Sequence, residues 1–296
     1  MNKPAASTYI KLVFVAMFWG GTFIAGRMIA GTIPHMIAAA GRFMVACALL
    51  IPLAYKLEGG LPRLTRQQMV ATFALGATGI FLYNICFFKA LSIMPAGRTA
   101  LFVALNPTVT ALALVIFFRE HLSARKWLGI AIAFAGAAVI ITRGDLAGAL
   151  HDISQSVGVG ELIMFCAISA WAAYTIIGRH ALKGLTPIAA TTYASLWGLL
   201  LLSVGAATEV PSMDWSLVTW KVVGAIVYLG ACGTVIGFVW YYEGVKALGP
   251  ARAAVFNNLV PVFGISFGAL MLGEPVLASM VIGGLLVIAG VTLTNR

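Results

Sequence analysis

Long apolar runs follow one another along the whole chain, separated by short links that carry charged residues, glycine or proline. Most runs hold about 20 residues, which is the length that an α-helix needs to cross the hydrocarbon layer of a membrane. The pattern predicts an all-α integral membrane protein with about ten transmembrane helices. The expected spans are 10–29, 35–55, 68–89, 95–117, 124–142, 159–179, 187–206, 217–242, 250–271 and 276–294.

The second half of the chain repeats the first. Residues 88–143 align with residues 242–296 at an offset of 154, and a weaker match at an offset of 152 links the remaining quarters. The polar link 143–158 lies between the copies, so we expect one repeat at residues 1–150 and another at residues 151–296. The aligned pairs are Arg98 with Arg252, Pro107 with Pro261, Glu120 with Glu274, Gly129 with Gly283, Gly136 with Gly290, Trp19 with Trp171, and Arg27 with Arg179.

The number of spans and the basic residues predict the topology. Five spans in each repeat would make the second repeat enter the membrane from the opposite side, so the two repeats would be inverted. If the N-terminus is cytoplasmic, 13 of the 19 Lys and Arg residues lie in inner segments, five lie outside and one, Arg42, lies within a span. Because basic residues favour the cytoplasmic side, we expect both termini there.

Composition supports a membrane protein and excludes other classes. The chain is 61% hydrophobic and 9% charged, with mean hydropathy +1.00, whereas soluble domains carry about 25% charged residues. Its net charge of +10 is spread over the links rather than gathered in one patch, so we expect no nucleic-acid partner. The four cysteines lie singly in different apolar runs, and we expect neither a metal nor a cofactor.

Two matched prolines mark a candidate site near the middle of spans four and nine. A proline within a helix removes one backbone hydrogen bond and frees the carbonyl four residues earlier, here at Val103 and Asn257 for Pro107 and Pro261. Asn106 and Asn257 place amides beside these kinks. Interrupted helices at this depth line the substrate sites of transporters with inverted repeats. The alternative is that the prolines are tolerated kinks and the amides join helices.

Aromatic residues supply the other part of the candidate site. Trp19 and Trp171 occupy matching positions in spans one and six, while Tyr83 and Tyr174 lie within spans three and six. Such side chains offer a large apolar surface with a polar tip, which suits amphiphilic small molecules. Trp and Tyr also anchor helices at membrane interfaces, and we expect that role for 240–241 near a helix end.

Arg42 is a charge deep within a predicted span, where it must face protein or water. It could bind a carboxylate or clamp neighbouring helices through their carbonyls, and we favour the clamp because the matching part of span seven reads Thr191-Thr192-Tyr193. With Pro107 and Pro261 it forms the predicted structural and hinge group. No acidic residue falls in the middle of a span, which favours neutral or zwitterionic cargo over cationic drugs.

An enzyme is not expected. Gly264-Ile-Ser-Phe-Gly268 matches the GxSxG pattern of hydrolases, but it lies within a continuous apolar helix rather than on a strand-to-helix turn. All four histidines fall in or beside the links. The match therefore predicts no nucleophile.

Several motifs together resemble the EamA repeat of the drug/metabolite transporter superfamily. They occur in the same order in both halves, and the resemblance implies ten helices, a central cavity and, in bacteria, export of amino acids or related metabolites. The sequence looks most like the branch that exports aromatic and neutral amino acids. The motifs are Trp19-Gly-Gly-Thr-Phe, Ala40-Gly-Arg42-Phe, Lys89-Ala-Leu-Ser, Ala100, Asn106-Pro107, Arg119-Glu120 and Gly129 with Gly136, then Trp171, Glu243-Gly, Ala254, Pro261, Gly273-Glu274 and Gly283 with Gly290.

The leading hypothesis is an inner-membrane exporter that works by alternating access around a cavity at mid-bilayer depth. We expect Trp19, Tyr83, Trp171 and Tyr174 to form the wall, and Asn106 and Asn257 to hold the polar groups of the substrate. The expected partners are a small-molecule substrate and the lipid bilayer; a monomer is sufficient, and the sequence fixes no oligomeric state. The alternatives are a passive pore, a lipid-handling scaffold, or an exporter of sugar- or nucleotide-linked metabolites.

Overall fold

A computed structural model describes residues 6–119, 123–142, 158–181, 184–248 and 256–294, and all regular secondary structure in these ranges is helical. The first half contains α1 (Ala6–Ala30), α2 (His35–Glu58), α3 (Arg66–Leu75), η1 (Gly76–Leu82), α4 (Tyr83–Ile93), α5 (Ala96–Val103), α6 (Asn106–Phe118) and α7 (Ala124–Ile141). The second contains α10 (Val159–Ala181), α11 (Pro187–Glu209), η2 (Val210–Ser212), η3 (Trp215–Leu217), α12 (Trp220–Tyr228), η4 (Leu229–Ile236), α13 (Gly237–Leu248), η5 (Phe256–Leu259), α15 (Val260–Leu272) and α16 (Ala278–Thr294).

Each expected span contains helix, although not every span is one uniform rod. The helices α3 and α4 continue through η1, and α12 and α13 continue through η4; both η segments are π-helical. In the described ranges, six helices are long and apolar enough to cross a membrane, or seven if the bent pair α5 and α6 is one span. The helices α15 and α16 are apolar but shorter. The protein is therefore a multi-pass helical membrane protein.

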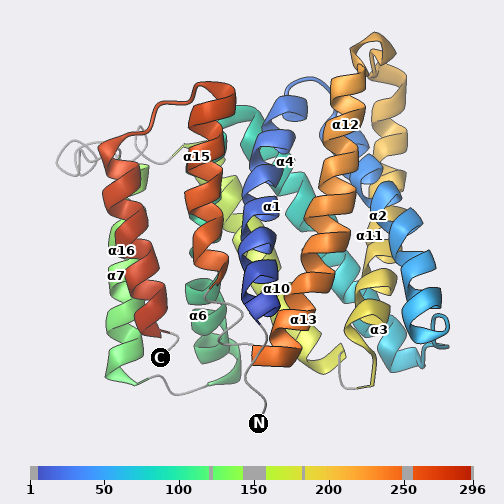
Figure 1. Cartoon of the computed structure of the whole chain (residues 1–296), viewed down its shortest axis with the longest axis horizontal. Helices are drawn as coiled ribbons and strands as arrows, with labels where there is room; N and C mark the ends of the chain where they lie inside the picture. The colour runs from blue at the N-terminus through green and yellow to red at the C-terminus, as the bar shows by residue number, and fades with distance from the viewer. Residues whose placement is uncertain (1–5, 120–122, 143–157, 182–183, 249–255, 295–296) are drawn as a thin grey trace.

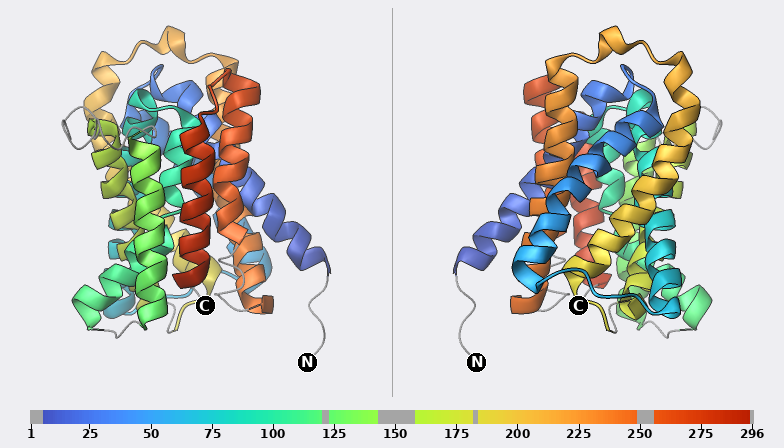
Figure 2. Two further views of the ribbon diagram at one scale, coloured as in Figure 1. Left: turned by 90° about the vertical axis from the view of Figure 1, so that its left-hand side faces the viewer. Right: turned by 90° about the vertical axis from the view of Figure 1, so that its right-hand side faces the viewer.

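Most helices run roughly along one common direction and form an elongated bundle, which α1 crosses obliquely (Figures 1 and 2). Helices α7 and α16 pack together at one end of its long axis, and α2 and α11 pack together at the other. Between these pairs, α1 packs against α15 and α13, while α10 packs against α4 and α6. Helix α1 begins and α16 ends at the same side of the bundle (Figure 2). The centre of the bundle thus lies between α1 and α10, whose sequences match.

The outward surface is apolar. The side chains of Phe117, Trp220 and Leu270 are 76%, 79% and 82% exposed, which would be unfavourable in water at about 25 cal/mol per Å². The interior is filled instead by alanine and by large side chains such as Phe87 and Phe88, which are fully buried. A chain with large apolar side chains on both its inside and its outside is suited to lipid as its solvent.

Close helix contacts recur in the two halves at the offset seen in the sequence. A Cβ on Gly283 would lie 2.6 Å from the carbonyl oxygen of Gly136, and a Cβ on Gly290 would lie 2.5 Å from that of Gly129. Gly129 matches Gly283 in the repeat, and Gly136 matches Gly290, so each contact is the repeat-related copy of the other. Helices α7 and α16 therefore cross on glycines that let their backbones touch, as small residues do in membrane helix pairs.

Three carboxylates from the second half bind the first half near the starts of α2 and α5. Glu209 accepts hydrogen bonds from the first N–H groups of α2, and Glu274 accepts them from Ala96 and Gly97 at the start of α5, at 2.7 and 3.0 Å. Glu161 forms a buried ion pair with Arg98 at 2.7 Å. A carboxylate is favourable at a helix N-terminus because it satisfies free N–H groups and complements the helix dipole. All three contacts lie where α2 and α5 begin, at the side of the bundle away from the start of α1 (Figure 1).

Candidate functional site

Four of the six residues predicted to bind substrate lie in one aromatic cluster. Trp19 of α1 and Trp171 of α10 both contact the ring of Phe238 in α13, with centroid distances of 5.9 and 6.2 Å. Trp171 also contacts Tyr83 of α4 and Tyr174 of its own helix, both at 5.2 Å. The aromatic cluster, defined as these five residues, therefore joins the two halves of the chain at the centre of the bundle.

Two further rings extend the aromatic cluster. Tyr241 contacts Trp19 at a centroid distance of 5.4 Å, although we expected it to anchor a helix end at the membrane interface. Phe87 stacks on Tyr83 at 5.9 Å with an angle of 19° between the rings, and it is fully buried. Aromatic surface thus continues from α13 to α4.

Glycines on the facing helices make room for these rings. The indole Nε1 of Trp19 donates a hydrogen bond to the carbonyl of Gly233 at 2.9 Å, and a Cβ on Gly237 would lie 2.6 Å from the same nitrogen. A Cβ on Gly79 would lie 2.2 Å from the ring of Tyr174. Because no real Cβ tolerates such distances, these rings can occupy their positions only against glycine.

Arg42 lies beside the aromatic cluster. Its side chain is 7% exposed, and its guanidinium donates hydrogen bonds to Thr234 Oγ1 at 3.2 Å and to Asn84 Oδ1 at 3.0 Å. Its Nη2 lies near Gly233, the residue whose carbonyl accepts the hydrogen bond of Trp19: a Cβ on Gly233 would lie 3.9 Å from Nη2 and 2.5 Å from Thr22 Cγ2. The contacts join α2 to both α4 and η4, as a clamp would, and they also hold a positive charge at the centre of the bundle.

Both acceptors of Arg42 are anchored at π-helical turns. Asn84 is the second residue of α4, just after η1, and donates to the carbonyl of Ile80 at 2.7 Å, while Thr234 lies in η4 and donates to that of Leu229 at 3.0 Å. Since π-helical turns are rare and are frequently found at functional sites, their presence on both sides of Arg42 supports a functional centre here.

The position that matches Arg42 in the second half is Ala194. A Cβ on Gly230 would meet the carbonyl of Arg42 at 2.7 Å, and a Cβ on Gly76 would meet the carbonyl of Ala194 at the same distance. Gly76 and Gly230 differ by 154, and Arg42 and Ala194 differ by 152, so the two contacts are equivalent. The sequence comparison placed this position a few residues earlier, at Thr191–Tyr193. The second half has no arginine at either place.

The matched prolines lie just after breaks in the helices. Pro107 lies in the first turn of α6, and Pro261 lies in the first turn of α15, which follows the 3₁₀ segment η5. Helices α5 and α6 meet at an angle of 41°. A proline in a first turn leaves no hydrogen bond unmade, so each proline is placed to begin the second part of a broken helix.

The two predicted amides lie at the same breaks. Asn106 starts α6, and its Oδ1 is buried with no hydrogen-bond partner among the described residues. Asn257 is half-buried in η5. Among the described residues, neither amide side chain forms a hydrogen bond with the aromatic cluster. Only Trp19, Tyr83, Trp171 and Tyr174 of the predicted binding residues are therefore brought together.

Three residues at the centre were missed by sequence reasoning: Phe238, Thr234 and Asn84. Phe238 lies four residues after Thr234 and three before Tyr241, so these side chains follow one helical face. That spacing was visible in the sequence. Asn84 is an amide within an apolar span and carried the same signal as Asn106. What the sequence did not indicate is that Asn84 and Thr234 both accept hydrogen bonds from Arg42.

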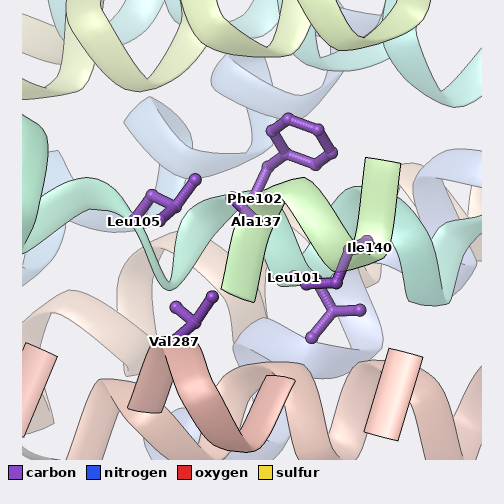
Figure 3. A pocket seen from close by; sticks show the side chains of 6 residues that line it. All are labelled: Leu101, Phe102, Leu105, Ala137, Ile140 and Val287. Carbon is purple, nitrogen blue, oxygen red and sulfur yellow. The ribbon is translucent and has the colours of Figure 1, made fainter. Parts of the chain in front are cut away.

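The remaining chemistry is structural. The Ser266 hydroxyl donates to the carbonyl of Val262 within α15 at 2.8 Å, so the GxSxG sequence is part of an ordinary helix. In the described ranges, no group of three or more His, Cys, Asp or Glu side chains could hold a metal ion. A small pocket between α5, α7 and α16 is lined only by apolar side chains and offers no polar contact to a substrate (Figure 3). Its lining residues are Leu101, Phe102, Leu105, Ala137, Ile140 and Val287.

Comparison with known proteins gives the same result in sequence and in structure. The profile of the EamA-like transporter family matches residues 6–142 and again residues 158–296. A solved crystal structure superposes with a TM-score of 0.65 at 16% identity and covers 97% of each chain, which shows a shared fold.

Two curated relatives cover nearly the whole chain. The uncharacterized transporter YyaM of Bacillus subtilis is 33% identical over 286 residues, which span 96% of this chain and 92% of that protein. A protein of Streptantibioticus cattleyicolor named "Probable terminal-alkyne amino-acid exporter" is 28% identical, again over 96% and 92% of the two chains. Both are similar in length as well as in sequence, and both names describe transporters.

Proposed function

Because the chain belongs to the EamA-like transporter family and is a transporter rather than an enzyme, we propose that it exports aromatic and neutral amino acids. Export would proceed by alternating access across a bacterial inner membrane. The observation that carries this proposal is the aromatic cluster, in which Trp19 and Trp171 meet through Phe238 at the centre of the bundle. The relative named "Probable terminal-alkyne amino-acid exporter" supports amino acids as the substrate class.

The proposed architecture is ten transmembrane helices in two inverted repeats, residues 1–150 and 151–296. Support comes from the repeat-related glycine contacts between α7 and α16 and from the equivalent contacts at Arg42 and Ala194. It also comes from the helix order, in which α1 begins and α16 ends at the same side (Figure 1). We place that side and both termini in the cytoplasm, because most basic residues lie in the corresponding links.

In the proposed cycle, the halves rock around the aromatic cluster. Trp19, Tyr83, Trp171 and Tyr174 contact the apolar part of the substrate, and the amides of Asn106 and Asn257 bind its polar groups. The breaks before Pro107 and Pro261 act as hinges, since a broken helix can bend without losing further backbone hydrogen bonds. The substrate would cross in one protomer, and no second chain is required.

The packing of α4 suggests which side is closed. Helix α4 packs against both α1 and α2, whereas its counterpart α13 has no comparable packing against α10 and α11 over the described residues. The ion pair of Arg98 with Glu161 and the capping of α5 by Glu274 lie at the same side as this closure. With the termini in the cytoplasm, the structure would be closed outward and open inward, ready to take up cytoplasmic substrate.

Purified protein in liposomes tests the proposal. Uptake of labelled L-phenylalanine should saturate with concentration and should exceed uptake of the D-enantiomer, because a substrate-binding site has a defined, chiral shape. Trp19→Ala and Asn257→Ala should each slow uptake. If both variants carried the amino acid at the wild-type rate, the assigned site would be wrong.

The passive pore predicts a different result. Flux through a pore would stay linear with concentration and would not distinguish the enantiomers. A pore should also be lined by a constriction of polar or charged groups.

Sugar- or nucleotide-linked cargo would need several basic side chains to bind its phosphate, and Arg42 alone lies at the described centre. Competition by a nucleotide sugar but not by phenylalanine would favour that alternative.

A further inference from the structure

The charge of Arg42 is buried without an acidic partner. The structure describes six acidic residues, and each is engaged elsewhere: Glu58 with Thr186, Glu161 with Arg98, Glu209 with the start of α2, Asp214 with Ser216, Glu243 with Lys11, and Glu274 with the start of α5. The two hydrogen bonds of Arg42 go to neutral acceptors. A buried charge is strongly unfavourable unless it is paired, so an anion should complete this site.

The guanidinium has donors left for that anion. It carries five N–H groups, of which one on Nε and one on Nη1 are used. The other three have no hydrogen-bond partner among the described residues. Two of them belong to Nη2, which lies near Gly233, the residue whose carbonyl accepts the hydrogen bond of the Trp19 indole. Their number and planar arrangement fit a carboxylate, which binds arginine through two parallel hydrogen bonds.

The surroundings select an apolar body for the carboxylate. Trp19 and Phe238 lie 5.9 Å apart between their ring centroids, and Trp171 and Tyr83 continue the same surface. In contrast, the described centre holds no carboxylate that could pair with an ammonium group. The site therefore has a strong partner for one end of an amino acid and an apolar surface for its side chain, but no charged partner for its amine.

From this asymmetry we propose that Arg42 binds the carboxylate of the substrate, and that carboxylic acids with an apolar body but no amino group are also ligands. The proposal rests on the proposed function for the direction of transport only, because binding can be measured without transport. It changes the role of Arg42 from a clamp alone to a substrate-binding residue, and it extends the cargo from zwitterions to arylalkyl monocarboxylates.

Thermal unfolding of the purified protein in detergent tests binding directly, because a ligand that binds only the folded state raises Tm. Three compounds of matched size are compared: L-phenylalanine, 3-phenylpropanoate, which lacks the ammonium, and phenethylamine, which lacks the carboxylate. We expect the first two to raise Tm at similar concentrations. Phenethylamine should need a concentration at least about tenfold higher, as expected for the loss of a charge-assisted hydrogen-bond pair.

Variants then identify the residue. Arg42→Gln should weaken binding of both carboxylates about tenfold or more, while Arg42→Lys, which keeps the charge but not the planar donors, should have an intermediate effect. Lys89→Gln, which removes an exposed positive charge from α4, is the matched control and should leave binding unchanged. If Arg42→Gln does not fold, Arg42→Lys and the three ligands on the wild type still decide the question.

The outcomes separate this proposal from the exporter. Saturable phenylalanine transport, with phenethylamine binding as tightly as 3-phenylpropanoate, would overturn the role of Arg42 and leave the exporter intact. Carboxylate-dependent stabilisation that Arg42→Gln abolishes, in a protein without saturable transport, would overturn the exporter and leave the site. No stabilisation by either carboxylate, or equal stabilisation of wild type and folded Arg42→Gln, would overturn the site.

Discussion

The pair of helices α7 and α16 and the centre of the bundle are built differently. In the pair, matched glycines contact each other's backbones and the same residue types serve in both halves. At the centre, Trp19 and Trp171 match, but other matched positions hold different residues: Arg42 corresponds to Ala194, Tyr83 to Gly237 and Asn84 to Phe238. The backbone arrangement and the two tryptophans are shared, but the charge of Arg42 and the amide of Asn84 occur in the first half alone.

This difference separates what the fold needs from what transport needs. The hydrophobic effect does not drive helices together in a membrane, so their packing depends on close backbone contact. A large side chain in either copy would prevent that contact, and small residues are therefore needed in both. A binding site needs only one such charge, so in a duplicated chain the matching position of the second half is free to hold another residue. Trp19 and Trp171 are kept in both copies, whereas the positions of Arg42, Tyr83 and Asn84 have changed in the second copy, and mutations in the two regions should have separable effects.

The largest effect is expected in the symmetric pair. In Gly136→Leu, the new Cβ would lie 2.6 Å from the carbonyl oxygen of Gly283, and backbone cannot move aside as a side chain can. We expect a loss of about 3 kcal/mol of folding free energy, at the upper end of the cost of overpacking. Size-exclusion profiles and Tm in detergent measure it. Gly224→Leu is the control, since no atom lies within 4 Å of that position; similar losses in both variants would contradict the account.

At the centre the effect should fall on transport instead. Trp19→Ala removes the ring that contacts Phe238 and Tyr241, and we expect KM for phenylalanine to rise about tenfold, consistent with roughly 1.4 kcal/mol of lost contact. Initial rates in liposomes measure this change. The monodisperse yield should stay near that of wild type. Trp220→Ala, which removes an outward-facing indole, should alter neither; an unchanged KM in Trp19→Ala would remove the aromatic cluster from the site.

A smaller change tests the asymmetry itself. Gly237→Ala adds a methyl group that would lie 2.6 Å from Trp19 Nε1, and the indole should lose its hydrogen bond to Gly233. We expect transport to fall about threefold, since a misplaced ring still offers most of its surface. Indole fluorescence should shift at the same time. Gly224→Ala provides the comparison, and a Gly237→Ala protein with wild-type transport and fluorescence would show that the ring is not held there.

The smallest effect comes from making the two halves more alike. Arg119 ends α6 with φ 53°, whereas the equivalent Gly273 ends α15 with φ 66°. The left-handed conformation costs arginine about 1–2 kcal/mol. Replacing it by glycine removes that cost, but glycine loses more backbone entropy on folding, which offsets part of the gain. Arg119→Gly should therefore stabilise the protein by about 0.5 kcal/mol, seen as a higher Tm. A lower Tm would mean that the arginine side chain contributes more than its backbone costs.

Much of the fold could be predicted from the sequence because hydrophobic runs and repeat offsets report it directly. The expected span 35–55 became α2 at His35–Glu58, and the matched Pro107 and Pro261 marked the two places where helices break. The number of membrane crossings and their inversion stay predictions, since the shorter helices α15 and α16 do not meet the length expected of a span.

Less of the site could be predicted, for a physical reason. Aromatic residues within spans were visible, and four of them meet, but which rings touch depends on how each helix is rotated about its axis. The bridge through Phe238 and the two acceptors of Arg42 come from such rotations and from π-helical turns, which leave little trace in composition. Sequence reasoning therefore found Arg42 but not what it binds.

The most direct test of alternating access through this centre is counterflow. Liposomes preloaded with unlabelled L-phenylalanine are diluted into a trace of labelled L-phenylalanine, and the label inside is followed with time. The account predicts that wild-type protein lets the label rise transiently above its final level, because loaded sites exchange faster than the gradient decays, and that Trp19→Ala weakens this rise. Label that climbs to its final level without ever exceeding it would contradict the account and indicate a pore.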